Sequence, residues 1–346
     1  MRESLRIEIS RPRPDEWRVV ERSHHAAEGV FRVPFKMAEL AELLAEINSC
    51  LLDANASAEA QTSRLRRLGG RLAEMTLPQE LRGKLSTHSG LAEFFLDDAS
   101  IMLPVELYPH SDGVLGEAMP VSRHWFCEGS RSTPRQTANK KDCQALIVAD
   151  PAENLPAAQQ EGKALFRKLR SQKGWKCRYS GRAMTSAGLS RELPDTDVLH
   201  LAAHYVAADS GLAQAAPGVM MADGPWLPAE SFSTPEMVFA NCCHAGVPLG
   251  DDGNLSLAGH FLKHGSRHVI APFLPVSDQA AAEFAREFYQ AYLVSGNVAQ
   301  AVWSAKRIVG PASWMYWHFG PVANESVAEV PPPKEPAKKN AVVSGC

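Results

Sequence analysis

The sequence predicts an α/β protein whose second half forms a largely parallel sheet covered by helices on both faces. Continuous apolar runs recur from residue 143 onward, and such runs are typical of strands buried on both sides. Amphipathic segments that separate the runs indicate crossover helices. Four such runs are CQALIVAD (143–150), DVLHLAAH (197–204), MVFANCC (237–243) and RHVIAPFLPV (267–276).

The first half combines strands with helices. Weak alternation over 4–34 predicts two or three strands with a turn at Pro12–Pro14, and apolar residues at three- and four-residue steps predict helices over 36–85. LAEFFLD (91–97) and IMLPVELYP (101–109) suggest a strand hairpin, and VSRHW follows at 121–125.

In the second half, each remaining segment has an assignment. Residues 157–174 form an amphipathic stretch with basic residues near its end and glycine just beyond, which predicts a helix. Further helices are expected at 184–195, 255–265, 279–296 and 298–310, and further strands at 175–181 and 315–322. The segment from 324 to 346 is rich in Pro, Lys and Ala, which predicts a disordered tail.

Composition excludes several classes of protein. The formal net charge is −3, which gives no basis for direct nucleic-acid binding. No apolar run reaches the ~18 residues of a membrane span, and the N-terminus lacks the apolar core of a signal peptide. The seven cysteines are scattered without a CxxC, which predicts reduced thiols and a cytoplasmic protein.

Two strand ends carry the residues that predict chemistry. His204 ends one predicted strand and Cys243 ends the next, in MVFANCCHAG (237–246). In parallel sheets, sites lie outside the carboxyl ends of the strands. If the two strands are neighbours, an imidazole and a thiol emerge at the same edge. A cysteine nucleophile needs such a base together with backbone amides for the oxyanion.

A metal site is the competing interpretation of the same residues. His200, His204, Cys242, Cys243 and His244 offer enough ligand atoms for zinc. Adjacent cysteines at a strand end point in opposite directions, however, and the spacing fits no common zinc pattern. The sequence also has no phosphate-binding glycine loop. We therefore expect neither a metal nor an organic cofactor.

From about residue 85 to 322 the chain resembles CHAT-domain peptidases, bacterial relatives of caspases, metacaspases and separases. Their strand ending H-x-A-x-H-G and their L-N/S-A-C-x-x-G motif are similar to LHLAAHY (199–205) and VFANCCHAG (238–246). Further ordered matches are VMMADGPWLPAESF, SLAGHFLKHGSRHVIAPFLPVSD, FYQAYLVSGNVAQAVWSAKR, IMLPVELYPHSDGVLGEAMPVSR and LIVADPAENLPAAQQE.

The resemblance implies roles for particular residues. His204 matches the histidine of a catalytic dyad and Cys243 the nucleophile, while Cys242 takes the place of a small residue. The backbone amides at Tyr205 and Cys243 would hold the oxyanion. His244 is expected to be a loop filler, and His200 a core or supporting residue.

The sequence departs from the family at three positions. Tyr205 replaces the glycine after the histidine, and Leu274 replaces a tryptophan. Asn241 replaces the aspartate that in metacaspases helps hold a basic side chain, so a strict Lys/Arg preference does not follow. Asp150 and Asp278 could supply charge to a substrate pocket, although both could instead be structural caps.

The resemblance implies a caspase-like sheet flanked by helices, with a smaller N-terminal α/β region that resembles a degenerate caspase-like half. We expect an N-terminal region at 1–135, a peptidase domain at 136–323 and a tail at 324–346. The implied function is a cysteine endopeptidase that cleaves a specific protein, in bacterial defence or signalling, under an activating protein or upstream sensor. Self-cleavage within 205–235 is possible. The alternative is an inactive interaction scaffold.

Overall fold

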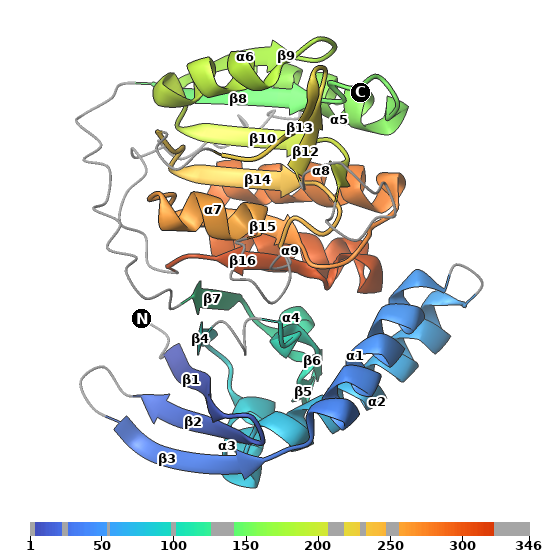
Figure 1. Ribbon diagram of the computed structural model, residues 1–346, viewed down its shortest axis with the longest axis vertical. Coiled ribbons are helices and arrows are strands. Elements are labelled where there is room, and N and C mark those ends of the chain that lie inside the picture. The colour runs from blue at the N-terminus through green and yellow to red at the C-terminus, as the bar shows by residue number, and fades with distance from the viewer. Residues whose placement is uncertain are drawn as a thin grey trace, which may run out of the picture.

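The computed structural model describes residues 4–22, 27–53, 56–97, 102–125, 142–206, 218–228, 233–246 and 256–321. Its main feature is a sheet of eleven strands in the order β3-β2-β1-β4-β7-β16-β15-β14-β10-β8-β9, which runs the length of the molecule (Figure 1). The sheet is mixed but mostly parallel, as the sequence predicts.

The second half of the chain supplies six neighbouring strands. Five of them are parallel, and β16 runs antiparallel to β15. Their bounds are β8 (Cys143–Ala149), β9 (Trp175–Ser180), β10 (Val198–Ala202), β14 (Met237–Asn241), β15 (His268–Pro272) and β16 (Tyr316–Phe319). All six predicted strands are confirmed. The runs of β10, β15 and β16 are buried throughout and those of β8 and β14 nearly so, whereas β9 is the outer strand and is partly exposed.

Helices cover the two faces of this half. Successive side chains of β8 enter different cores: Ile147 packs toward α5 (Pro156–Arg170), α8 (Asp278–Ser295) and α9 (Val298–Val309). Val148 packs in the other core, which includes residues of α6 (Ser186–Glu192) and α7 (Leu257–Lys263). Short 3₁₀ turns follow at η2 (Leu193–Asp195) and η3 (Pro311–Ser313). A small antiparallel sheet of β11 (Tyr205–Val206), β12 (Gly218–Met221) and β13 (Gly224–Trp226) follows β10.

The ends of α8 and the start of α9 follow from local chemistry. The Ser277 hydroxyl accepts a hydrogen bond from the Ala280 amide and begins α8. Gly296 ends that helix with a φ of 63°, a conformation that favours glycine. Asn297 then caps α9 by accepting from the Gln300 amide at 2.9 Å.

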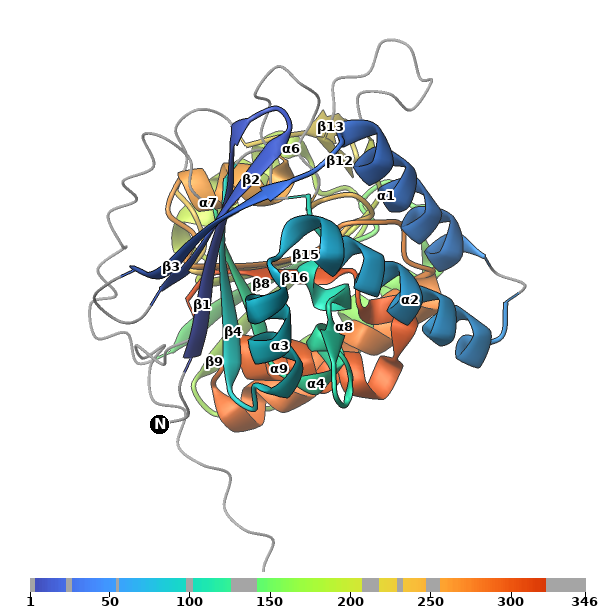
Figure 2. The same cartoon turned by 90° about the horizontal axis from the view of Figure 1, so that it is seen from below.

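Within the described residues, the first half adds four α-helices and seven strands, five of them in the main sheet. Strands β1 (Ser4–Arg13), β2 (Glu16–Arg22) and β3 (Ala27–Pro34) form an antiparallel meander. The helices α1 (Met37–Leu52) and α2 (Ala58–Thr76) form a hairpin that projects to one side (Figures 1 and 2), followed by α3 (Gln79–Thr87). The remaining elements are β4 (Leu91–Leu96), η1 (Val105–Leu107), β5 (Pro109–His110), β6 (Gly113–Val114), α4 (Leu115–Ala118) and β7 (Val121–Trp125).

The predicted strand hairpin over 91–109 is wrong. β4 pairs in parallel with β1 and β7, and Val105–Leu107 forms a 3₁₀ turn instead of a strand. Pro104, directly before that turn, has no N–H to donate to a ladder. The Glu106 carboxylate is buried against the guanidinium of Arg123, which fixes the turn beneath the sheet.

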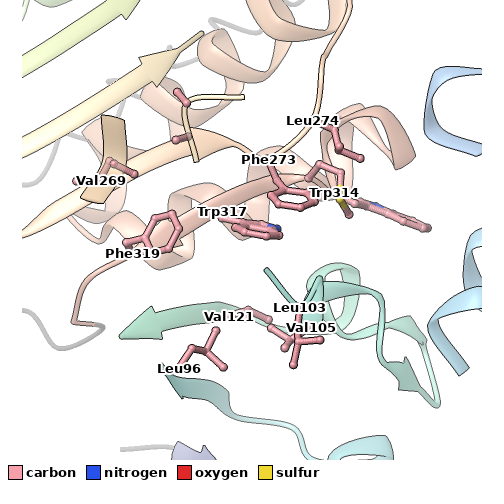
Figure 3. Packing of buried hydrophobic residues seen from close by; sticks show 14 of the residues in the cluster. Leu96, Leu103, Val105, Val121, Val269, Phe273, Leu274, Trp314, Trp317 and Phe319 are labelled. Carbon is pink, nitrogen blue, oxygen red and sulfur yellow. The ribbon is translucent and has the colours of Figure 1, made fainter. Parts of the chain in front are cut away.

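The two halves join at β7 and β16. In the described ladder, Phe319 pairs with Arg123, whose guanidinium lies 3.6 Å from the centre of the Trp317 ring. Trp317 and Phe319 face Val121 and Leu103 across this junction (Figure 3). Apolar packing therefore continues from one half to the other.

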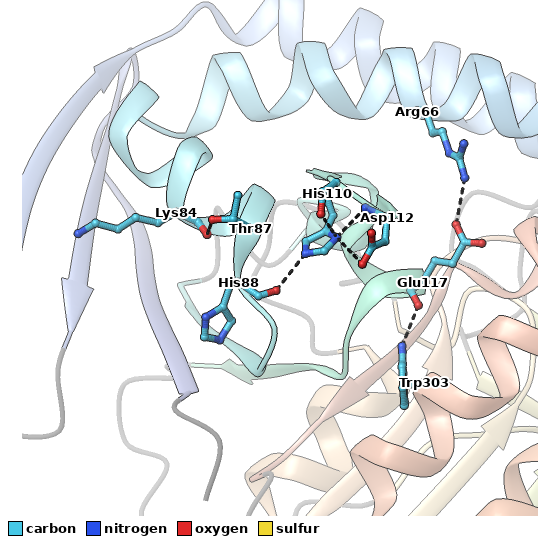
Figure 4. Close-up of polar contacts among 9 residues, drawn as sticks. Arg66, Lys84, Thr87, His88, His110, Asp112, Glu117 and Trp303 are labelled. Atoms are coloured by element: carbon cyan, nitrogen blue, oxygen red, sulfur yellow. Dashed lines mark hydrogen bonds and ion pairs between the residues drawn. The ribbon is translucent and has the colours of Figure 1, made fainter.

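Polar contacts at the same junction tie α2, α4 and α9 together (Figure 4). Glu117 forms an ion pair with Arg66 at 3.4 Å, and its carbonyl accepts from the Trp303 indole at 2.8 Å. His110 contacts the His88 carbonyl at 2.9 Å.

The predicted boundary at 135/136 and the tail at 324–346 lie outside the described residues, so the domain division stays a prediction. No helix among the described residues has both the length and the apolar character to cross a membrane.

Candidate active site

The register of β10 and β14 determines where the two predicted catalytic residues lie. These strands are parallel neighbours, and Ala202 pairs with Asn241. His204 and Cys243 are each two residues beyond that pair. Both residues therefore leave the same edge of the sheet at equivalent positions.

A pocket of about 70 Å³ at this edge brings four of the predicted site residues together. His204, Cys243, Asn241 and Asp278 line it. Its other walls are Leu155, Ala158, Glu161, Ala202, Ala203, Pro272, Val276, Ala281 and Tyr316. His204 is exposed and Cys243 is half-buried, so both can be reached from solvent.

The two adjacent cysteines differ sharply. Cys242 is fully buried, and its thiol donates to the Leu201 carbonyl at a sulfur–oxygen distance of 3.7 Å. Burial raises the pKa of Cys242 to about 12, so this thiol stays protonated. Cys243 instead lies in the pocket, where its thiol contacts the Val276 carbonyl at 3.9 Å.

The backbone beside the thiol forms a tight turn. Within the described part of the chain, the Cys243 amide has no hydrogen-bond acceptor, and His244 turns the backbone with a φ of 62°. The following turn is fixed by bonds from Ala245 to the Cys242 carbonyl and from Gly246 to the Pro272 carbonyl, both 3.1 Å. Burial lowers the pKa of the His244 side chain, which contacts the Phe273 backbone.

Tyr205 replaces the family's glycine, and its backbone amide remains available to an oxyanion. The Met220 amide donates to the His204 carbonyl at 2.9 Å, which makes Tyr205–Val219 a non-hydrogen-bonded pair of the β11–β12 ladder. The N–H of Tyr205 therefore points away from β12. Its side chain is buried in the core, and its hydroxyl has no hydrogen-bond partner among the described residues.

Beneath the pocket is a network that the sequence analysis missed. The Asn241 amide donates to both carboxylate oxygens of Glu161, at 2.9 and 3.0 Å, and its oxygen accepts from the Tyr316 hydroxyl. His200 Nε2 lies 2.9 Å from Glu161 without hydrogen-bond geometry, and its Nδ1 lies 3.3 Å from the Tyr289 hydroxyl.

Glu161 carried one signal in the sequence. It lies on the buried stripe of α5 formed by Ala158, Leu165 and Leu169, where a charged residue has to find a partner. The identity of that partner depends on tertiary structure.

The remaining two acidic residues occupy different places. Asp278 is exposed at the rim of the pocket, at the first position of α8. Asp150 does not line the pocket. Its carboxylate accepts from the Asn154 amide at 2.8 Å and from the Gln159 side chain at 2.7 Å, which corresponds to a structural cap.

No group of three or more His, Cys, Asp or Glu side chains within the described ranges is arranged to hold a metal ion. The five candidate zinc ligands do not converge, because Cys242 lies in the core while Cys243 lies in the pocket.

The mostly parallel sheet flanked by helices matches the fold of caspase-like cysteine proteases. The chain belongs to the CHAT domain family, whose model matches residues 66–321. No curated protein sequence matches the chain.

Two solved structures of the Saccharomyces cerevisiae separase–securin complex are similar in fold. Their TM-scores are 0.59 and 0.55, at 9% and 10% sequence identity. Each alignment covers 92% of this chain and 30% of the matched chain, so the present chain spans less than a third of that protein's length. The Arg-specific cysteine proteinase gingipain R aligns with a TM-score of 0.45 and 11% identity, over 81% of this chain and 75% of its own.

Proposed function

We propose that the chain is a cysteine endopeptidase with His204 and Cys243 as its catalytic dyad. One observation supports this above all: an accessible imidazole and an accessible thiol leave neighbouring parallel strands at the same register position and line one pocket. The CHAT family match and the caspase-like fold support the same class of reaction.

In the proposed mechanism, His204 removes the thiol proton or pairs with a preformed thiolate. Cys243 attacks the scissile carbonyl and forms a tetrahedral intermediate, whose oxyanion accepts hydrogen bonds from the amides of Tyr205 and Cys243. His204 then protonates the leaving amine, and water hydrolyses the acyl-enzyme and releases the product. Asn241 and Asp278 are the proposed contacts of the substrate side chain in the pocket. Asp150 does not line the pocket, so it would influence the substrate side chain only through the residues that it contacts.

The test is labelling with a peptide that carries an electrophilic group at its C-terminus. We expect one modified residue, Cys243, and loss of that label in Cys243→Ala. His204→Ala should slow labelling about 100-fold or more, the usual contribution of a general base. Cys242→Ala is the matched control and should still react. Equal, slow labelling of several cysteines, unchanged by His204→Ala, would contradict the dyad.

An inactive interaction scaffold is the second candidate, and Tyr205 is the observation that favours it. Its buried ring stands where the family has glycine, next to the proposed oxyanion site. Under this alternative, peptide cleavage is absent while the fold and the pocket persist.

We further propose a specific protein substrate and control by a protein partner or upstream sensor, in a cytoplasmic role in bacterial defence or signalling. The separase chain that this chain resembles is in complex with securin, which supports a partner-controlled protease. Cleavage of candidate proteins encoded near this chain, followed by mass spectrometry, tests the substrate assignment.

A further inference from the structure

A groove of about 620 Å³ lies between α5 and α8, beside the candidate active site. It shares two of its walls, Glu161 and Asp278, with the pocket that holds Cys243. Both helices begin near the carboxyl edge of the sheet and pack against its same face. The groove therefore leads away from the pocket along that face.

The lining has room for a polypeptide backbone. Four alanines, at positions 157, 164, 282 and 285, line the groove together with Leu165 and Tyr289. Small side chains allow a backbone to approach the helices closely. The volume of the groove is in the range of ligand sites in proteins. Gln160 and Gln279 offer hydrogen-bonding groups near the pocket end.

The far end of the groove carries two basic side chains, Arg286 and Lys168. Arg286 forms ion pairs with Glu283 at 3.1 Å and Glu287 at 2.9 Å, which occupies both nearby carboxylates of α8. Lys168 consequently has no ion pair within the described part of the chain, although it is half-buried in the groove wall. Burial lowers the pKa of Lys168, the nearby Glu287 carboxylate acts in the opposite direction, and Arg286 lowers the pKa further. A carboxylate placed in the groove would give Lys168 an ion-pair partner.

We propose that this groove binds the stretch of substrate polypeptide adjoining the scissile bond, with an Asp or Glu side chain on Lys168. The proposal rests on the peptidase function proposed above. Lys168 lies seven residues from Glu161 on α5, about 10 Å along the helix axis. An extended chain covers that distance in about three residues. The acidic side chain should therefore lie three or more residues from the one that enters the pocket.

Cleavage-site profiling tests the proposal without knowledge of the natural substrate. A peptide library prepared from a bacterial proteome is incubated with the full chain, and the products are sequenced by mass spectrometry. We expect acidic residues to be enriched about tenfold at one position three or more residues from the cleaved bond, which corresponds to about 1.4 kcal/mol. Lys168→Glu should remove or reverse this enrichment. Lys163→Glu, an exposed position of α5 outside the groove, should leave it unchanged.

A second pair of variants fills the groove. Ala164→Trp and Ala282→Trp should reduce cleavage of library peptides at least tenfold, while Cys243 still reacts with iodoacetamide at the wild-type rate. Cleavage without an acidic preference, or with one that Lys168→Glu does not change, would overturn the groove assignment and leave the dyad standing. No cleavage by the wild-type chain, together with no labelling of Cys243 by the electrophilic peptide, would overturn both. Labelling of Cys243 without cleavage would overturn the groove assignment alone.

Discussion

At the scale of single residues, the candidate site depends on which side chains face the core and which face the pocket. Alternation along β14 and its extension sends Cys242 into the core and Cys243 into the pocket. This distinction was predictable, because the strand run and the motif register both select the second cysteine. The Asn241–Glu161 contact was not predictable, since the two residues are 80 positions apart in the sequence.

Tyr205 offers a test at this scale. Its hydroxyl is buried without a hydrogen-bond partner among the described residues, and burial raises its pKa. Tyr205→Phe should therefore be neutral or stabilise the protein by up to about 1 kcal/mol, because it removes a buried unsatisfied group.

The free energy of unfolding in urea measures the effect of Tyr205→Phe. Labelling of Cys243 should be unchanged, since the proposed contribution of Tyr205 is its backbone amide. A loss of more than about 1 kcal/mol would show instead that the hydroxyl makes a favourable interaction.

At the scale of elements, the close approach of α5 to β8 positions Glu161 under the pocket. A Cβ at Gly162 would lie 2.5 Å from the Ala149 Cβ and 3.0 Å from the Tyr179 ring. Only glycine allows the helix to lie this close to the strand.

Gly162→Ala should therefore destabilise the protein by about 1–3 kcal/mol, because the helix must move away from the sheet. We also expect slower labelling of Cys243, since Glu161 moves with the helix and loses its contact with Asn241. Gly83→Ala is the matched control. A Cβ there meets nothing within 4 Å, and alanine should stabilise the exposed turn of α3 by up to about 1 kcal/mol. Equal effects at both positions, measured by thermal unfolding, would contradict the packing argument.

Most elements could be predicted from the sequence, and the exceptions have physical causes. The runs at β8, β10, β14 and β15 are apolar because the strands are buried on both faces, so their pattern is strong. The direction of β16 carries no such signal, because a buried strand has the same composition in either direction. The 3₁₀ turn at Val105–Leu107 resembles a strand in composition, and only Pro104 argues against one.

At the scale of the whole molecule, buried histidines beside the junction of the two halves link stability to pH. His268 on β15 and His318 on β16 are buried, with 3.1 Å between their ring nitrogens. Burial lowers the pKa of His268 to about 3 and that of His318 well below its usual value. Both rings are therefore neutral in the folded protein.

The sign of the pH dependence follows from these lowered values. Between the unfolded pKa of about 6.5 and the folded pKa, the unfolded chain binds more protons, so stability falls as the pH falls. Each histidine contributes a slope of up to about 1.4 kcal/mol per pH unit below pH 6. Urea unfolding of the Cys243→Ala protein between pH 7.5 and 4.5 should reveal this loss. A His268→Gln, His318→Gln variant should show a shallower slope. A flat profile in the parent protein would contradict the assignment of neutral rings.

The continuous sheet has two outer strands, β3 and β9, and both carry charge. On β9, Lys176 and Arg178 keep 65% and 43% of their side chains exposed, and on β3 the Arg32 side chain is 66% exposed. Bringing either border against an identical border of a second molecule would crowd these cations and their carboxylate partners along an unpaired ladder. We expect these charges to oppose end-to-end growth of the eleven-stranded layer into fibrils, and neutralising the cations should make the protein prone to amyloid-like deposits.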